Sequence, residues 1–346
     1  MMEQALYSLD KNRTSISNWL FFVAVAVFAM IVIGAITRLT ESGLSMVEWR
    51  PLIGTLPPLN DAEWQRVFEL YQQTPEFQKK NFWMDLEDFK RIFFWEWFHR
   101  FWGRLIGIFY GLPYIYFLVR GKIPAGYHWP LFGLLILGGL QGLMGWYMVQ
   151  SGLIDRPSVS HYRLAAHLSL AFLILALLIY TANSIRQTPR GPNSRLYTYC
   201  WAALGILTIT IFWGAYVAGL DAGLIYNEFP FMGGALIPPE MWQLSPFWVN
   251  FFENIPAVQF THRWLGIASG IALVFVSFMG AKQKAGWPFH ALGALVLLQI
   301  GLGIATLLSG VWLPLATLHQ AVAALLVVTM SLCLYKTRPV ESFKAS

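Results

Sequence analysis

Eight long apolar runs dominate the sequence, and shorter polar stretches separate them. Each run has roughly 20 residues, the length that an α-helix needs to cross the hydrocarbon core of a bilayer. The approximate ranges of the runs are 19–37, 97–119, 130–150, 162–182, 197–218, 261–280, 287–308 and 314–335. The pattern predicts an all-α integral membrane protein with eight transmembrane helices.

The first four runs and the last four carry matching landmarks in the same order. These landmarks are Gly34-Ala35 with Gly43-Leu44 against Gly214-Ala215 with Gly223-Leu224, His99-Arg100-x-x-Gly103 against His262-Arg263-x-x-Gly266, Leu140-Gln141-x-x-x-Gly145 against Leu298-Gln299-x-x-x-Gly303, and Leu164-Ala165 before His167 against Leu315-Ala316 before His319. The repeat indicates a duplication. Because each half has an even number of spans, we expect two four-helix bundles related by a pseudo-two-fold axis along the membrane normal.

This duplication predicts a division of the chain into two halves with short flanking segments. The predicted parts are a cytoplasmic N-terminal segment (1–18), a first half (19–182) that includes an outer loop (38–94), a cytoplasmic linker (183–196), a second half (197–335) and a cytoplasmic tail (336–346).

Charge sets the predicted orientation. Only 12% of the residues are charged, against about 25% in soluble domains. We attribute the net charge of +6 to basic cytoplasmic loops and expect no nucleic-acid partner. The loop 219–260 contains four acidic residues and no Lys or Arg, so it is predicted to lie outside, with both termini inside. No cleavable signal is evident, which suits a bacterial inner-membrane protein or a mature organellar one.

The first outer loop is long enough to have its own structure. Asn60-Asp61-Ala62-Glu63 reads as a capping box and predicts a helix through about Gln73. A second helix is predicted from Pro75 toward the second span. The aromatic residues of this region would suit either a lid at the membrane surface or an amphipathic interfacial segment, and they are Phe77, Phe82, Trp83 and Phe89.

Four histidines occupy equivalent places in the two halves. They lie within about two turns of the outer end of spans two, four, six and eight, and they are His99, His167, His262 and His319. Two opposed imidazoles inside an apolar four-helix bundle are what a six-coordinate haem iron needs. Zinc is less favoured, because no third ligand of the Cys, Asp or Glu type recurs in both halves. The sequence therefore predicts one haem site per half.

Charged residues surround these histidines unequally. Arg100 and Arg263 directly follow the paired histidines, and Arg38 closes the first span. These arginines suit haem propionates, although snorkelling at the membrane boundary would also explain them. Glu96 lies three residues before His99, whereas Gln259 holds that place in the second half. This asymmetry points to chemistry in the first half only; the alternative is a glutamate favoured by the start of a helix.

Two further residue sets bear on the sites less directly. His161 lies off the helical face of His167 but could reach the outer side of the first site. Cys200 and Cys333 fall in apolar runs and form no metal or disulfide pattern, so we interpret them as small buried hydrophobic residues.

Nearly the whole chain, about 19–335, resembles the haem A synthase family. The resemblance rests on the duplication, the four outer histidines, the stretch from Arg91 to Arg100 with its Glu-x-x-His-Arg, and the stretch from Ser160 to Leu168. Both stretches are similar to the subgroup shared by proteobacteria and mitochondria. The first outer loop has no cysteine, so the cysteine pair of another subgroup does not carry over.

The resemblance implies a role for each site. His262 and His319, with Arg263, would bind a permanent haem b, while His99 and His167, with Arg100 and Arg38, would bind the substrate haem O. Successive hydroxylations would convert one peripheral methyl group of haem O to a formyl group, giving haem A for terminal oxidases. Glu96 would lie at the reacting side as the catalytic residue.

The resemblance also implies partners. Electrons would come from an external donor, because the chain has no flavin or nicotinamide fingerprint, and haem O synthase could deliver the substrate within the membrane. The sequence leaves the oligomeric state open. Two alternatives also stay open: a di-haem, quinol-linked electron-transfer cytochrome, and a haem carrier without turnover.

Overall fold

The computed structural model describes residues 2–48, 55–154, 157–186 and 194–339, and this part of the chain is mostly helical. Eight of its helices are long and apolar enough to cross a membrane, which confirms the predicted all-α membrane fold. Their bounds are α1 Met2–Leu39, α3 Leu86–Val119, α4 His128–Ile154, α5 His161–Arg186, α6 Ser194–Gly219, α8 Ile255–Lys282, α9 Trp287–Leu308 and α10 Leu313–Thr337.

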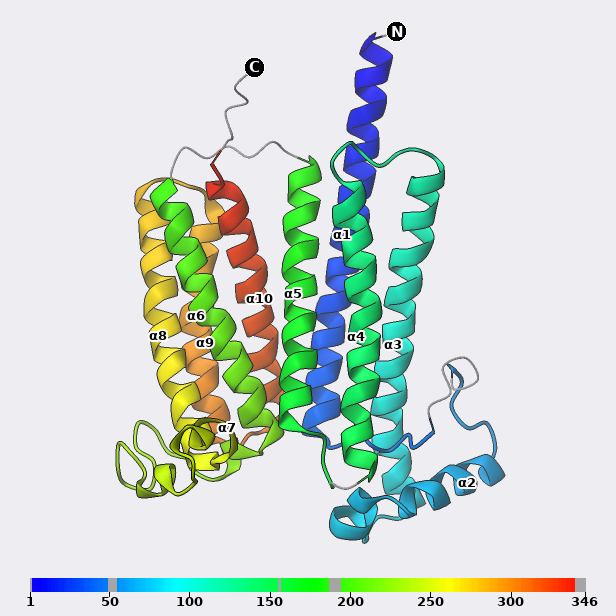
Figure 1. The fold of residues 1–346 in the computed structure, drawn as a ribbon, viewed down its shortest axis with the longest axis vertical. Coiled ribbons are helices and arrows are strands. Elements are labelled where there is room, and N and C mark those ends of the chain that lie inside the picture. The colour runs from blue at the N-terminus through cyan, green and yellow to red at the C-terminus, as the bar shows by residue number, and fades with distance from the viewer. Residues whose placement is uncertain (1, 49–54, 155–156, 187–193, 340–346) are drawn as a thin grey trace.

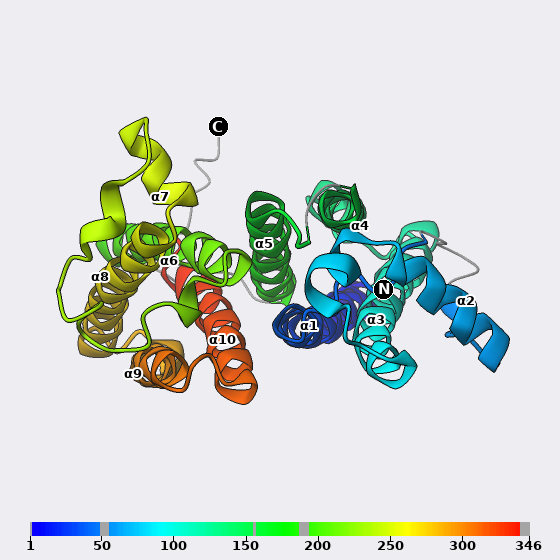
Figure 2. The same ribbon diagram turned by 90° about the horizontal axis from the view of Figure 1, so that it is seen from below.

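The eight helices run side by side in two groups of four, as Figure 1 shows. One group contains α1, α3, α4 and α5, and the other contains α6, α8, α9 and α10. The helix ends that adjoin the chain termini lie at one end of the bundle, which we call the terminal end. The loops that follow α1 and α6 lie at the opposite end, which we call the loop end. Seen from below in Figure 2, α1 and α5 of the first group lie next to α10 of the second, where the two groups meet.

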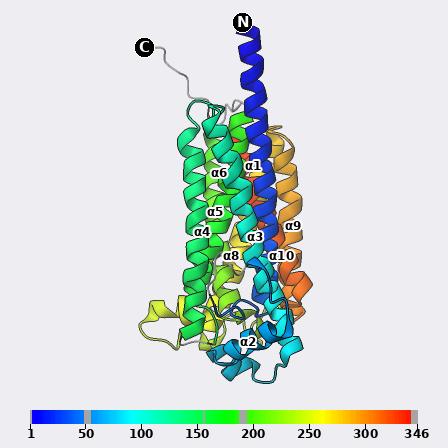
Figure 3. The same cartoon turned by 90° about the vertical axis from the view of Figure 1, so that its right-hand side faces the viewer.

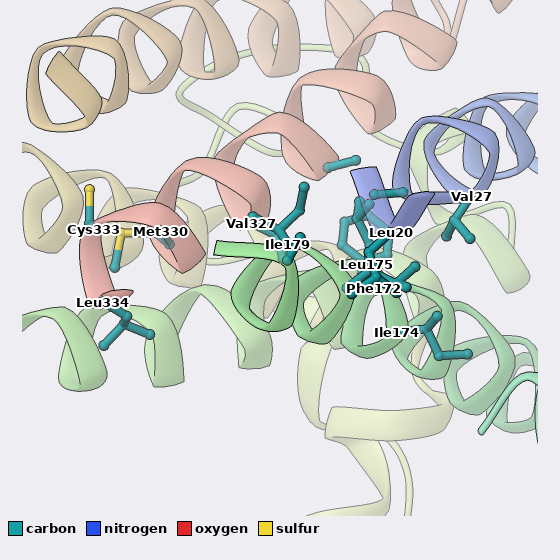
Figure 4. Close-up of a cluster of buried hydrophobic side chains, with 14 of the residues drawn as sticks. Leu20, Val27, Phe172, Ile174, Leu175, Ile179, Val327, Met330, Cys333 and Leu334 are labelled. Carbon is teal, nitrogen blue, oxygen red and sulfur yellow. The ribbon is translucent and has the colours of Figure 1, made fainter. Parts of the chain in front are cut away.

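The two groups share an apolar core. Helix α5 packs against α6 and α10, and α1 packs against α10. Leu20 of α1, Leu175 and Ile179 of α5, and Val327 and Met330 of α10 are buried in one cluster that crosses this junction (Figure 4). Because lipid tails are as apolar as these side chains, close packing rather than water exclusion holds such helices together.

The first long loop, at the loop end, begins as the sequence predicts. Helix α2 (Asp61–Gln72) starts at Asn60, whose side-chain oxygen accepts a hydrogen bond from the Glu63 backbone N–H at 2.9 Å. We call residues 55–85 the lid. As Figure 3 shows, α2 lies across the loop end of the bundle, beyond the membrane-spanning part of the helices.

The predicted second helix from Pro75 toward the second span does begin at Pro75, but it is short. It ends with the π-helical segment η2 (Phe77–Asn81), and a break follows. A new helix, α3, then starts because the Asp85 carboxylate accepts hydrogen bonds from the N–H groups of Glu87 and Asp88, both at 2.9 Å. Helix α3 therefore begins well before the apolar run at 97–119.

The lid aromatics do not act as one surface. Phe89 is fully buried, and Phe77 packs in the same cluster beneath α2, whereas Phe82 and Trp83 are exposed. This cluster, together with the hydrogen bond from the Trp97 indole to the Thr55 carbonyl at 3.0 Å, fixes the lid on the start of α3.

Short helices form the second long loop. They are η3 Ala222–Leu224, η4 Pro239–Trp242, η5 Phe247–Val249 and α7 Asn250–Glu253. At the other end of the bundle, α1 takes in most of the segment predicted as a separate N-terminal part (1–18). Much of the predicted linker and tail, at 187–193 and 340–346, lies outside the described residues.

Candidate haem sites

Each histidine of the first pair packs against a glycine of a neighbouring helix. His99 of α3 packs against Gly34 of α1, so that a Cβ atom on Gly34 would lie 3.2 Å from the imidazole Cε1. His167 of α5 packs against Gly145 of α4 in the same way, at 3.1 Å. Only glycine lets a neighbouring helix approach these rings so closely.

The second half repeats this arrangement residue for residue. A Cβ atom on Gly214 of α6 would lie 3.0 Å from Cε1 of His262 on α8, and one on Gly303 of α9 would lie 3.0 Å from Cε1 of His319 on α10. Four matched glycine–histidine contacts support the predicted duplication at the level of side-chain packing.

The polar surroundings of the rings fit a haem iron. Nδ1 of His262 lies 3.2 Å from the Thr210 carbonyl, an acceptor that fixes the ring tautomer and leaves Nε2 to bind metal. Nδ1 of His99 is buried without a hydrogen-bond partner among the described residues. Buried polar atoms of this kind usually have a partner. The paired imidazoles packed against glycines of neighbouring helices therefore fit haem in both halves, and each pair would hold the iron through its ring nitrogens.

Glu96 sits at the centre of a buried network beside the first site. The side chain is 3% exposed. Ser45 Oγ and the Met46 N–H each donate to Oε2 at 2.7 Å, and Arg100 donates to Oε1 at 2.5 Å. All three groups are donors, so the carboxylate is held as an acceptor. Glu96 thereby ties the segment after α1 to α3, one helical turn from His99.

Arg100 and Arg263 hold equivalent loop segments. Arg100 also donates to the Met46 carbonyl at 3.1 Å, and Arg263 donates to the Tyr226 carbonyl at 2.9 Å. Gln259, which replaces Glu96 in the second half, donates to the same Tyr226 carbonyl at 3.1 Å. The carboxylate of the first half accepts from the loop, whereas the amide of the second half donates to it.

Arg38 connects the two halves. Its guanidinium donates to the Ala218 carbonyl in the last turn of α6, the first helix of the other half, and forms an ion pair at 2.8 Å with Asp221, which follows that helix. The sequence suggested Arg38 for haem propionates but could not show this cross-connection, because the partner lies in the other half.

His161 also faces the junction. It is 4% exposed and packs against Tyr216 of α6, with ring centroids 5.4 Å apart. A Cβ atom on Gly219 would meet the His161 backbone Cα at 2.8 Å, so α5 and α6 nearly touch here. Its Nε2 lies 3.7 Å from a Glu253 carboxylate oxygen. The structure places His161 between the halves.

Sequence reasoning did not assign the residues that support the site. Ser45 and Met46 carried no pattern that marked them. Gln141 and Gln299 did carry one, since both belong to the repeated Leu-Gln-x-x-x-Gly motif, yet the motif suggested no role for them. Cys200 and Cys333 are buried, as predicted.

Comparison with known proteins decides the family. The pattern of the COX15-CtaA family, described as a cytochrome oxidase assembly protein, matches residues 17–331. The chain belongs to this family. It is 49% identical to a heme A synthase of Rhodospirillum centenum over 335 residues, which is 95% of this chain and 90% of that protein.

Two further heme A synthases show similar likeness. The identity is 45% to that of Nitrosomonas eutropha, over 91% of this chain and 92% of that protein. It is 46% to that of Rhizobium johnstonii, over 92% of this chain and 90% of that protein. The COX15-CtaA match includes all four histidines and both helical groups, and the resemblance found in the sequence is confirmed.

Proposed function

We propose that this protein is a heme A synthase that oxidises one peripheral methyl group of haem O to a formyl group. The observation that carries the proposal is the pair of glycine-cradled imidazole sites in a chain whose relatives are heme A synthases. Two successive hydroxylations of one carbon, each of which would use one dioxygen with two electrons from the external donor and two protons and release one water, give a geminal diol. Loss of water from the diol leaves the formyl group. The product would serve a terminal oxidase.

The second half is proposed to hold a resident haem b between His262 and His319. The Thr210 carbonyl already fixes the His262 ring, and Gly270 of α8 packs closely on Ile300 of α9, at 3.3 Å from a Cβ placed on the glycine. When bound, this haem would supply one-electron redox chemistry. A closely packed, pre-oriented site suits a cofactor that stays.

The first half is proposed to hold haem O between His99 and His167. Helix α3 touches α4 much less than α8 touches α9. Gly107 and Gly142 occupy the places of Gly270 and Ile300, and a Cβ atom on either would meet nothing within 4 Å. The looser packing would let a substrate load and leave, and it supports the assignment of the exchanging porphyrin to this half.

Glu96 is proposed to act on the substrate of the first half. It lies one turn from His99, and no carboxylate takes its place in the second half. Held as an acceptor by Ser45, Met46 and Arg100, it would stabilise positive charge that develops beside the reacting methyl group. Arg100 and Arg38 are proposed to lie near the haem O propionates, and Arg263 near those of haem b.

We assign the protein to a bacterial inner membrane, with the terminal end in the cytoplasm and the haem sites near the outer face. Electrons would come from an external donor, and haem O synthase would supply the substrate. The two helical groups are taken as the functional halves, 19–182 and 197–335.

Pigment extraction from cells that express the protein with a source of haem O tests the proposal. We expect haem A, or its hydroxymethyl precursor, under aerobic and reducing conditions. Haem b together with unaltered haem O would instead favour a carrier. A quinol-linked cytochrome that conducts across the membrane is disfavoured, because all four histidines lie toward the loop end of their helices.

A further inference from the structure

The second long loop carries a stretch that projects sideways from the bundle. We call residues 239–253, which contain η4, η5 and α7, the aromatic loop. Figure 2 shows α7 outside the outline of the spanning helices, and in Figure 1 it lies at the level where α6 and α8 end. Around a bundle that crosses a membrane, the headgroup region of the bilayer lies at this level.

The aromatic loop presents large apolar side chains to its surroundings. The exposed fraction is 43% for Trp242, 60% for Phe247 and 63% for Trp248. Trp242 and Phe247 stack with their ring centroids 4.8 Å apart, and both rings pack on Phe251, at 5.5 and 5.8 Å. A group of exposed apolar side chains marks a surface that contacts a membrane or another protein.

Buried hydrogen bonds hold these rings in place from the inside. Asn250 is fully buried, and its amide donates to the Leu244 and Phe247 carbonyls at 2.8 and 2.9 Å. The Asn250 side-chain oxygen accepts the Leu244 N–H at 2.9 Å. The amide of Asn254 donates to the Glu240 carbonyl at 2.8 Å. The exposed rings therefore belong to a formed surface, which need not fold when it meets its partner.

The charges of the aromatic loop turn back toward the protein. Its charged residues are Glu240 and Glu253. Glu240 accepts a hydrogen bond from the Tyr226 hydroxyl at 3.0 Å, and Glu253 accepts one from the Tyr162 hydroxyl of α5 at 2.6 Å. The rings, rather than the carboxylates, are thus what the aromatic loop offers to its surroundings.

The helix on which this loop packs has a lipid-facing stripe. Helix α7 packs against α8. Trp264, Ile271 and Phe278 of α8 are 51%, 67% and 62% exposed, and their spacing of seven residues places them on one stripe along the helix. Side chains of this kind on a spanning helix face lipid. The aromatic loop therefore adjoins, at the level of the headgroups, a helix that the bilayer already covers.

We propose that the aromatic loop is an interfacial anchor, whose Trp242, Phe247 and Trp248 rings insert into the headgroup region of the outer leaflet. Tryptophan suits this region because its ring is apolar while its N–H can still bond to water or headgroups. Because α7 packs on α8, the anchor also fixes the depth at which the loop end of α8 sits in the bilayer. The proposal requires only that the eight helices cross a membrane, and it does not depend on haem.

A spin label at Trp248→Cys tests the proposal in the full-length protein, placed in nanodiscs of phosphatidylethanolamine and phosphatidylglycerol. Cys200 and Cys333 are 0% exposed, so the label attaches at the introduced cysteine. EPR power saturation then compares collisions with oxygen, which concentrates in lipid, and with a water-soluble nickel chelate. We expect nickel access at position 248 to be several-fold lower than at an aqueous position. Phe247→Cys is an independent second site and should behave alike.

Two reference labels set the scale. Glu69→Cys lies on the exposed side of α2, beyond the spanning helices, and Ile271→Cys lies on the lipid-facing stripe of α8. The ratio of oxygen to nickel access at position 248 should fall between the ratios at these two positions. A ratio equal to that at Glu69→Cys would overturn the proposal, because the ring would then lie in water. A label that neither reagent reaches would overturn it as well, since protein would then cover the aromatic loop.

Discussion

Single residues decide whether an imidazole can point into either site. The glycines opposite the four histidines are unlike most glycines of the spanning helices, because their missing side chains make room for a ring. Elsewhere on the same helices, Gly142 and Gly301 face open space. Helices α4 and α9 therefore each carry a glycine that faces a histidine ring and another that faces open space, and the second can serve as a control for the first.

Gly303→Ala should weaken haem binding in the second half. The new methyl carbon would lie 3.0 Å from Cε1 of His319 and would push the ring out of line. We expect the low-spin haem absorbance per protein to fall at least several-fold in the purified variant. Gly301→Ala, which adds the same methyl group two residues away without a contact within 4 Å, should bind haem normally. Equal haem contents in the two variants would show that Gly303 is not needed to make room for the His319 ring.

Glu96→Gln should separate chemistry from binding. The amide keeps the size of Glu96 and can still accept from Ser45 and Met46, but it loses the negative charge. We expect haem A formation to fall on the order of a hundredfold or more, while the haem b spectrum and the yield of folded protein stay unchanged. Extracted pigments and optical spectra measure the two effects. Loss of the haem b spectrum would make Glu96 structural.

At the scale of elements, the lid contains a buried polar network of its own. Tyr71 donates to Glu76 Oε2 at 2.9 Å, and Asn81 donates to the Tyr71 hydroxyl at 2.7 Å. Burial raises the pKa of Glu76 to about 8 from its ordinary 4.5, with the Tyr71 hydrogen bond and Lys80 opposing the rise. The nearby carboxylates of Glu41 and Glu96 add to it.

The lid should therefore loosen as the pH rises. Between pH 4.5 and about 8 the closed lid binds one proton more than the open lid, so closing becomes less favourable throughout this window. Above about pH 8 Glu76 is ionised in both the closed and the open lid, and the stability of the closed lid does not fall further on its account. Amide hydrogen exchange of residues 61–81, corrected for the change of the intrinsic exchange rate with pH, should show more frequent opening of the lid at pH 8 than at pH 6. Glu76→Gln cannot ionise and should remove the difference; a persisting difference would assign it to another group.

At the scale of the whole molecule, two similar halves differ in how tightly they close. Contacts across the junction, such as Arg38 with Asp221, join the halves at the loop end. Within the halves, α8 and α9 pack closely, while α3 and α4 leave Gly107 and Gly142 uncovered. The duplicated plan thus yields one closed and one more open site.

Gly142→Ile should close the first half as Ile300 closes the second. The side chain would enter the space between α3 and α4, where a methyl group meets nothing within 4 Å. We expect a several-fold lower rate of haem A formation at limiting haem O, with the haem b content unchanged. Gly133→Ile, on the same helix and equally free of contacts, is the control. If Gly142→Ile instead lost haem b and kept normal turnover, the first half would hold the resident haem b and the second half the substrate haem O.

The sequence by itself determined the eight spans, the duplication and the four histidines. These follow from local properties: apolar length, which the bilayer demands, and repeated spacing, which places residues on one helix face. The family could also be identified from motifs such as Glu96-x-x-His99-Arg100. The start of the lid helix was predictable as well, since a cap at Asn60 needs only neighbouring residues.

Only the tertiary structure decided which partners the polar groups take. Arg38 pairs with the other half, Glu96 ties Ser45 and Met46 to α3, and His161 packs on α6, all across distances that no local pattern encodes. The break before α3 was missed because Asp85 caps a new helix where the aromatic run looked continuous. The difference in closure between the halves likewise depends on packing between separate helices, which spacing along one helix cannot report.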